Sequence, residues 1–276
     1  MAAFTEIAPE VYLLRCPVLD VNSTLVVGGE VAVVVDTLST DAQALELLEV
    51  IRGITTLPLL IVNTHAHFDH CYGNGVVADD SPGGGIWAHE AAATALRERG
   101  DTLQREWYRE WLPTDPELAE GLAAVTVRVP NRTVHSESTM DIGGRLLELR
   151  HLGRGHTDGD LIVTVPDANV LLAGDLVEQG APPSFGDSYP LDWPETVAAL
   201  LHYAMPTTVV VPGHGAPVDA DFVRAQHDDL TTLAWLIRDG HADGAEIKAV
   251  AARAPFDSET AITAVTRGYA ELAGRI

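Results

Sequence analysis

Thr64-His65-Ala66-His67-Phe68-Asp69-His70 places four strong metal-ligating side chains within six positions, directly after the apolar run of residues 58–62. The run is typical of a buried strand, and open α/β sheets usually carry their chemistry at the carboxyl ends of such strands. Because His-x-His-x-Asp-His spacing rarely arises by chance, we interpret the segment as part of a metal site rather than a polar loop. Four ligands in one loop cannot complete two metal coordination shells, so further ligands must come from elsewhere.

The composition is that of a globular protein with a large excess of acidic residues. Hydrophobic residues make up 46% of the 276 residues, and the formal net charge is −23 at pH 7. This length suits one large domain or two small ones. The average field of such a chain repels a phosphate backbone, so we expect no nucleic-acid partner. Bound divalent cations would offset part of the charge.

Cysteine usage and hydropathy favour a cytoplasmic protein. Two cysteines, Cys16 and Cys71, do not make a disulfide framework. Residues 1–6 lack the basic and apolar regions of a signal peptide, and no apolar run approaches the length of a membrane span. We therefore expect a small-molecule substrate and no membrane partner, while the oligomeric state does not follow from these residues.

The first part of the chain reads as strands interrupted by one helix. Thr40 and Gln43 form a capping-box pattern before an apolar helical repeat that stops at Gly53. The strand before this helix ends at Asp36, and the strand after it leads into the histidine segment. Strands that alternate with helices and collect polar groups at their ends predict an α/β fold. The expected strands cover residues 11–15, 23–27, 31–35, 57–62 and 86–88.

The segment that follows has a different character. We expect a helix over residues 89–99, and then residues 100–121 set Trp107 and Trp111 among charged side chains. This aromatic-rich, helical insertion is either a lid or substrate wall, or a surface helix that uses Trp107 and Trp111 to dock on the body. The sequence leaves both interpretations open.

The second half of the chain repeats the pattern of strands and polar strand ends found in the first half. One apolar strand ends at Asp175 and a later one at His214, just as earlier strands end at Asp36 and His65. A glycine-punctuated turn before them carries His156. We interpret these as two β-rich halves packed face to face, each covered by helices. The expected elements are strands at 125–129, 139–142, 145–152, 161–165, 170–173 and 207–211, and a helix near 194–203.

Residues 217–276 read as three amphipathic helices. Apolar spacing marks the first, a capping box at Asp243 and Glu246 begins the second, and Pro255 ends it. An apolar stripe over residues 262–272 predicts the third. We interpret the whole chain, 1–276, as one domain on which this helical extension packs.

Seven residues are thus expected to gather at strand ends or adjacent turns. Imidazole and carboxylate ligands without thiolate suit zinc, manganese or iron at a catalytic site. Two such metals about 3.5–4 Å apart, with a carboxylate able to bridge them, would hold a hydroxide that is a strong nucleophile. The seven residues are His65, His67, Asp69, His70, His156, Asp175 and His214.

The order of these motifs resembles the metallo-β-lactamase-fold superfamily. His-x-His-x-Asp-His, a lone histidine in a glycine-rich turn, Ala-Gly-Asp and Pro-Gly-His follow one another between residues 11 and 215. The resemblance implies an αββα sandwich with a dinuclear site between the sheets, and it implies that Asp36 supports the metal loop. It also implies that His65, His67 and His156 bind the first metal, that Asp69, His70 and His214 bind the second, and that Asp175 bridges.

The resemblance leaves the substrate open. Asp175 favours the broader hydrolase branches over the β-lactam-hydrolysing branch, which often has cysteine or another residue there. Glu178 stands where quorum-signal lactonases tend to place a tyrosine, and the tail shows no basic glutathione-binding elements like those of glyoxalase II. The segment after Asp175 should run past the site, so we expect Phe185 and Tyr189 to line the pocket unless they serve loop packing alone.

We therefore predict a hydrolase with two zinc ions, iron or manganese being alternatives, that cleaves an ester, thioester, lactone or amide. A bridging hydroxide attacks the carbonyl carbon, one metal polarises the carbonyl oxygen, and Asp69 orients the nucleophile. The main alternative is a mononuclear iron dioxygenase acting on persulfides, which uses the same motif series. A metal-bound scaffold without catalysis is the third interpretation, disfavoured because no ligand position has been lost.

Overall fold

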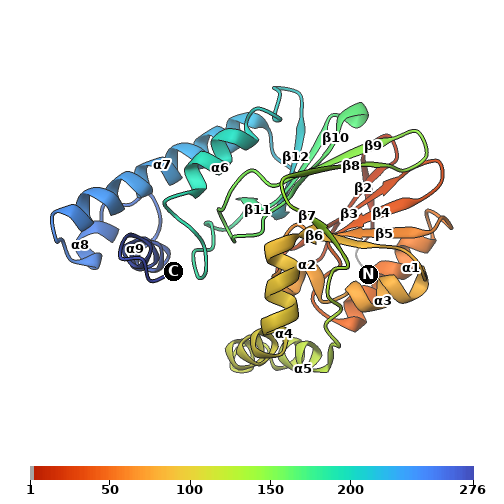
Figure 1. Cartoon of the computed structure of the whole chain (residues 1–276), viewed down its shortest axis with the longest axis horizontal. Coiled ribbons are helices and arrows are strands. Elements are labelled where there is room, and N and C mark those ends of the chain that lie inside the picture. The colour runs from red at the N-terminus through yellow and green to blue at the C-terminus, as the bar shows by residue number, and fades with distance from the viewer. Residues whose placement is uncertain (1–2) are drawn as a thin grey trace.

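Two β-sheets pack face to face between outer layers of helices in the computed structural model, which describes residues 3–276 (Figure 1). Met1 and Ala2, which open the amino-terminal segment considered above, lie outside the described range. The αββα architecture expected from the sequence is confirmed. None of the helices in residues 3–276 is both long and apolar enough to cross a membrane.

The first sheet has seven strands in chain order, antiparallel from β1 to β4 and parallel from β4 to β7. In the parallel part the carboxyl ends of the strands meet at one edge of the sheet. The histidine segment begins two residues beyond β5, at that edge. The strands are β1 (Thr5–Ala8), β2 (Val11–Arg15), β3 (Asn22–Val27), β4 (Ala32–Val35), β5 (Leu59–Val62), β6 (Ile86–His89) and β7 (Arg132–Val134).

The second sheet has five strands in the order β12-β11-β10-β9-β8, and only β11 and β12 run parallel to each other. Their register pairs Glu178 with His214, so these two residues also end at one edge. The strands are β8 (Glu137–Asp141), β9 (Leu146–Arg150), β10 (Ile162–Val165), β11 (Val170–Glu178) and β12 (Val209–His214).

Apolar side chains from both sheets fill the space between them. Val33 and Val35 of β4 belong to one buried cluster with Val163 of β10, while Val34 belongs to a separate cluster with Leu47 of the helical layer. The strand is therefore covered on both faces, which explains why the run is apolar at every position. Full burial of each valine contributes about 1.5–3 kcal/mol to folding.

Helices cover the outer face of each sheet. Helix α1 (Asp41–Arg52) begins with the predicted cap at Thr40, because Gln43 N–H donates to Thr40 Oγ1 at 3.2 Å. The Gln43 side chain accepts from Ser39 N–H at 3.0 Å, one residue before the partner that a capping box would use. The other helices of this half are α2 (Phe68–Cys71), α3 (Asn74–Asp80), α4 (Glu90–Trp111) and α5 (Pro116–Ala124).

The second sheet is covered by helices from the carboxyl-terminal part of the chain. A short 3-10 helix (Pro166–Ala168) joins β10 to β11, and α6 (Trp193–Leu200) precedes β12. The three helices expected in the tail are present as α7 (Ala220–Ala242), α8 (Ile247–Ala251) and α9 (Ser258–Leu272). Figure 1 shows them extending to the left of the sheets. Their buried residues, such as Ile237, belong to the same cluster as Val210 of β12 and Trp193 of α6.

Several expected boundaries are wrong. The helix predicted over 89–99 runs without a break to Trp111, and β1 and β7 were not predicted. Residues 125–129 form no strand, because side chains bind their carbonyl groups in place of a neighbouring strand: Gln104 Nε2 donates to the carbonyl of Val125 at 2.7 Å. Strand β11 continues past Asp175 to Glu178, so Asp175 lies within the strand rather than at its end.

Candidate metal centre

The fold brings all seven predicted ligands together. Their donor atoms form two groups, and within each group these atoms lie within 4.8 Å of one another. They come from the loop after β5, the start of α2, the loop between β9 and β10, and strands β11 and β12. The first group is His65, His67, His156 and Asp175, and the second is Asp69, His70 and His214.

In the second group, protein acceptors hold the outer nitrogen of each histidine. His70 Nδ1 donates to Asp36 Oδ2, and His214 Nδ1 donates to the carbonyl of Leu19, both at 2.8 Å. These hydrogen bonds place a ring proton on each Nδ1, so in the neutral ring each Nε2 presents a lone pair towards the centre. The inner nitrogens of His70 and His214 lie 3.3 Å apart.

Two histidines of the first group are held in the same way, whereas His156 Nδ1 has no hydrogen-bond partner among the described residues. His67 Nε2 donates to Asp187 Oδ2 at 3.1 Å, and His65 Nδ1 donates to Thr64 Oγ1 at 3.0 Å. The inner nitrogens of His67 and His156 then face each other at 2.8 Å. Two lone pairs at this separation repel unless a proton or a cation lies close to both.

Asp36 lies behind the ligands, where the resemblance places a supporting acid. Its carboxylate accepts the backbone N–H of Thr64 at 2.8 Å and the Thr64 hydroxyl at 2.7 Å, in addition to His70. Burial raises the pKa of Asp36, and the facing His70 ring opposes that rise. The carboxylate therefore orients both His70 and the loop that carries the other ligands.

The donor set fits bound cations. His65 Nε2 and Asp175 Oδ1 are buried and have no hydrogen-bond partner, which is costly unless another species completes their coordination. Burial lowers the pKa of His65 well below its usual value. Against the effect of burial, the Asp175 and Asp69 carboxylates raise the pKa of His214 to about 12. The field of these carboxylates thus favours positive charge at the centre.

Asp175 faces both donor groups. Its Oδ2 lies 3.3 Å from the Nε2 atoms of His156 and His214, and its Oδ1 lies 3.2 Å from His70 Nε2. The glycine of Pro-Gly-His makes this position possible, because a Cβ at Gly213 would lie 1.7 Å from Asp175 Oδ1. The glycine of the Ala-Gly-Asp motif has a φ of +54° and packs against Thr64.

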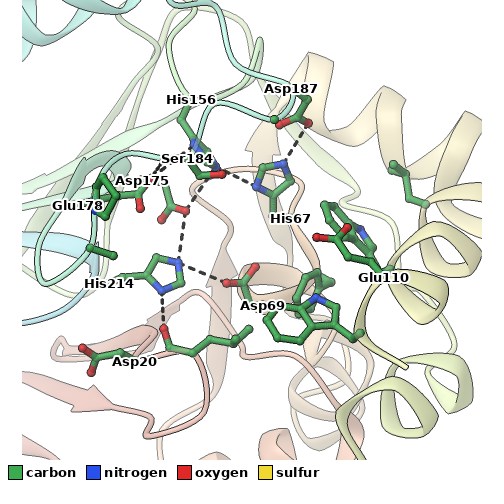
Figure 2. A pocket seen from close by; sticks show the side chains of 18 of the residues that line it. Asp20, His67, Asp69, Glu110, His156, Asp175, Glu178, Ser184, Asp187 and His214 are labelled. Atoms are coloured by element: carbon green, nitrogen blue, oxygen red, sulfur yellow. Dashed lines mark hydrogen bonds and ion pairs between the residues drawn. The ribbon is translucent and has the colours of Figure 1, made fainter. Parts of the chain in front are cut away.

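A cavity of about 780 Å³ opens directly on the centre (Figure 2). Trp107 and Trp111 of α4 line it, and both also pack against the buried cluster around Phe68, so neither interpretation of this segment is excluded. Glu178, the last residue of β11, lies on the other side, and Ser184 and Asp187 come from the loop between β11 and α6.

Phe185 and Tyr189 do not line this cavity, so the prediction for these two residues is wrong. Phe185 is 2% exposed and packs against Trp193 and Phe256, within the core formed by the carboxyl-terminal helices. The Tyr189 ring lies under the guanidinium of Arg154, 4.2 Å from its centroid. The loop turns its aromatic side chains towards α8 and α9 and its polar ones towards the cavity.

The comparison with known proteins identifies the family. The sequence profile described as "Metallo-beta-lactamase superfamily" matches residues 16–214, which contain all seven predicted ligands. The chain belongs to this superfamily. It is similar to metallo-beta-lactamase type 2 of Bacillus cereus, with 25% identity over 187 residues, 66% of this chain and 62% of that protein. It is also 32% identical to the acyl-coenzyme A thioesterase MBLAC2 of Bos taurus over 132 residues, 45% of this chain and 43% of the relative.

The chain thus spans less than two thirds of the length of these curated relatives. Solved structures of other proteins show the same fold. A metallo-beta-lactamase from Pontibacter korlensis superposes with a TM-score of 0.68 at 24% identity, over 84% of this chain and 99% of that one. The sec-alkylsulfatase Pisa1 from Pseudomonas sp. superposes with a TM-score of 0.78 at 18% identity, over 100% of this chain and 51% of that one.

Two residues that lie beside the predicted metal ligands were not predicted from the sequence to belong to the site. Asp187 is separated from its partner His67 by 120 positions, and no local pattern marks it. Glu178 was noted only for the tyrosine it replaces, yet it is 7% exposed, and its Oε1 lies 3.8 Å from His156 Nδ1. Its position three residues after Asp175 in β11 was the available signal, because β11 and β12 end together at the centre.

Proposed function

We propose that this chain is a dinuclear zinc hydrolase that cleaves an ester, thioester, lactone or amide at its carbonyl carbon. The observation that carries the proposal is the pair of adjoining groups of histidine and aspartate donor atoms at the base of an open cavity. The relatives add support, since they are named for a β-lactam and for an acyl thioester, and both compounds are attacked at a carbonyl.

The residues divide naturally between two metal positions. His65, His67 and His156 would hold one zinc ion, while Asp69, His70 and His214 would hold the other, with Asp175 between them because it faces both groups. Bound there, the ions would supply a Lewis acid for the carbonyl oxygen and lower the pKa of a water molecule.

The protein's own residues position the reactants. Asp69 lines the cavity and lies 3.3 Å from His214, so its carboxylate is placed to orient an attacking water and to take up its proton. Asp36 and Thr64 keep the His70 side of the centre in one geometry. The Trp107 wall is placed to hold the group attached to the carbonyl and to exclude bulk water from it.

Elemental analysis of protein purified without added metal is the first test. About two zinc ions per chain, together with turnover of at least one compound in a panel of esters, thioesters, lactones and β-lactams, would support the proposal. One iron per chain, with oxygen uptake in the presence of a persulfide, would overturn it in favour of the dioxygenase. Two zinc ions without turnover of any compound in the panel would favour a non-catalytic scaffold.

A further inference from the structure

We propose that the substrate is an uncharged or cationic carbonyl compound with an apolar acyl group, and that polyanionic carriers such as coenzyme A thioesters are disfavoured. This inference rests on the proposed hydrolase function and deepens it. Two observations carry it: an apolar wall that begins at the metal centre, and an acidic rim around that wall.

The wall comes from one face of α4. Leu103, Trp107 and Trp111 are four positions apart, so successive helical turns present them towards the cavity. The Trp107 ring lies 5.7 Å from the His67 ring and 5.1 Å from the Phe68 ring, centroid to centroid. An acyl chain attached to a carbonyl at the centre would meet this aromatic surface at once, where burial of apolar area favours binding.

Acidic side chains flank the wall. Glu106 and Glu110 are exposed and lie next to the two tryptophans on α4, and Figure 2 shows Glu110 at the cavity. Among the described residues that line the cavity, Arg99 is the single Lys or Arg. Its guanidinium lies 4.0 Å from Glu106 Oε2, so a neighbouring carboxylate already offsets part of its charge.

Recognition of phosphate groups requires the opposite arrangement. Sites for phosphates use arginine forks, lysines or the amino end of a helix, and the described rim offers only the partly compensated Arg99. At physiological ionic strength the Debye length is about 8 Å, so the rim carboxylates act directly on a charged group that enters the cavity. The net charge of −23 adds a long-range repulsion of anions.

A matched pair of thioesters tests the inference. Hexanoyl-coenzyme A and S-hexanoyl-N-acetylcysteamine share the acyl group and the thioester, but only the first carries phosphates. In each hydrolysis, water forms a C–O bond, the C–S bond breaks, and hexanoate and a free thiol leave. For the zinc-loaded full chain at low salt, we expect kcat/KM to be at least about tenfold higher for the neutral thioester, and the gap to narrow as salt rises.

Equal or higher kcat/KM for hexanoyl-coenzyme A would overturn the inference and leave the hydrolase intact. Failure to hydrolyse either thioester or any neutral ester would instead contradict the proposed function, and the inference with it. The two failures are therefore distinguishable in one experiment.

Two charge variants test whether the rim carboxylates or the overall net charge cause the preference for the neutral thioester. Glu110→Lys should raise the ratio of coenzyme A thioester to neutral thioester activity about fivefold or more, because it replaces a rim carboxylate with a cation. Glu49→Lys makes the same change in net charge on the exposed face of α1, away from the cavity, and should leave the ratio unchanged. Equal shifts in both variants would assign the discrimination to overall charge and overturn the role of the rim.

Discussion

Arg267 of α9 donates two hydrogen bonds to the loop that borders the metal centre, from Nε to the carbonyl of Ser188 and from a terminal nitrogen to the carbonyl of Asp187, each at 2.7 Å. The Asp187 carboxylate in turn accepts from His67. A helix outside the matched residues 16–214 therefore helps to set the orientation of a predicted ligand.

Other contacts tie the same loop to the carboxyl-terminal helices. Leu191 N–H donates to Glu271 of α9, and Arg238 of α7 donates to the carbonyl of Leu191, both at 3.3 Å. Together with the burial of Phe185, these contacts hold the cavity-facing residues in place. The helical tail is thus part of the support of the site.

Replacing Asp187 with asparagine should weaken zinc binding at the first position about tenfold, because His67 loses the carboxylate that makes its ring a stronger donor. Arg267→Ala should weaken it in the same direction by releasing the loop. Zinc affinity measured by competition with a chelator checks both. Arg253→Ala is the matched control, since its guanidinium contacts only Trp235 among the aromatic rings described and should leave the affinity unchanged.

Replacing His67 with alanine should abolish activity while leaving the fold largely intact. The side chain lies at the cavity surface and contributes one of the inner nitrogens, and its removal leaves no void in the core between the sheets. Circular dichroism and steady-state kinetics in metal-replete buffer measure the two effects. Retained turnover would contradict the assignment of His67 as a ligand.

Gly213→Ala should disrupt the metal centre more than the addition of a single methyl group would suggest. The added Cβ would overlap Asp175 Oδ1, so the carboxylate that faces both donor groups must move. We expect a loss of about 1–3 kcal/mol in the free energy of unfolding and a lower zinc content per chain. Gly75→Ala in α3 is the control, because its nearest contact would be at 3.7 Å and alanine favours a helix by up to about 1 kcal/mol. Equal zinc content in both variants would argue against this role of Gly213.

Removing the Trp107 side chain from the apolar wall of the cavity should change how kcat/KM depends on the length of the acyl group. In the wild type we expect kcat/KM to rise from acetyl to hexanoyl esters, because each methylene contributes about 0.8 kcal/mol when it is fully buried. Trp107→Ala should flatten this rise, with the largest loss on the longest ester, since its ring lies against Phe68 beside the centre. An unchanged slope in this variant would place the acyl group elsewhere.

The ligand positions could be predicted from the sequence because their residue types, order and places at strand ends are local properties. His65, His156 and His214 each follow or end a strand, and the sheets bring those ends together. The orientation of the 179–192 loop could not be predicted in this way. It depends on Arg267, Glu271 and Phe256, whose contacts with the loop bridge more than sixty positions and leave no periodic pattern. The pairing of Asp187 with His67 could not be predicted for the same reason, because 120 positions separate the two residues in the sequence.

Acidification should destabilise the fold through a histidine pair outside the metal centre. His89 caps α4 by accepting from Ala91 N–H, donates from Nε2 to the carbonyl of His135 at 3.0 Å, and stacks on His151 at 3.9 Å. Burial and the neighbouring His151 lower the pKa of His89, so the folded state favours the neutral ring. The unfolded chain then binds the proton more readily, so this stability is present above pH 6.5 and is lost as the pH falls below that value.

Urea unfolding at pH 7.5 and 5.5 checks this expectation. His89→Asn keeps a side-chain cap for α4 but cannot take up a proton, so the variant should lose less free energy of unfolding between the two pH values than the wild type does. Because zinc release on acidification affects both proteins alike, the difference between them isolates His89. Identical losses in the wild type and the variant would show that protonation of this ring does not limit stability in acid.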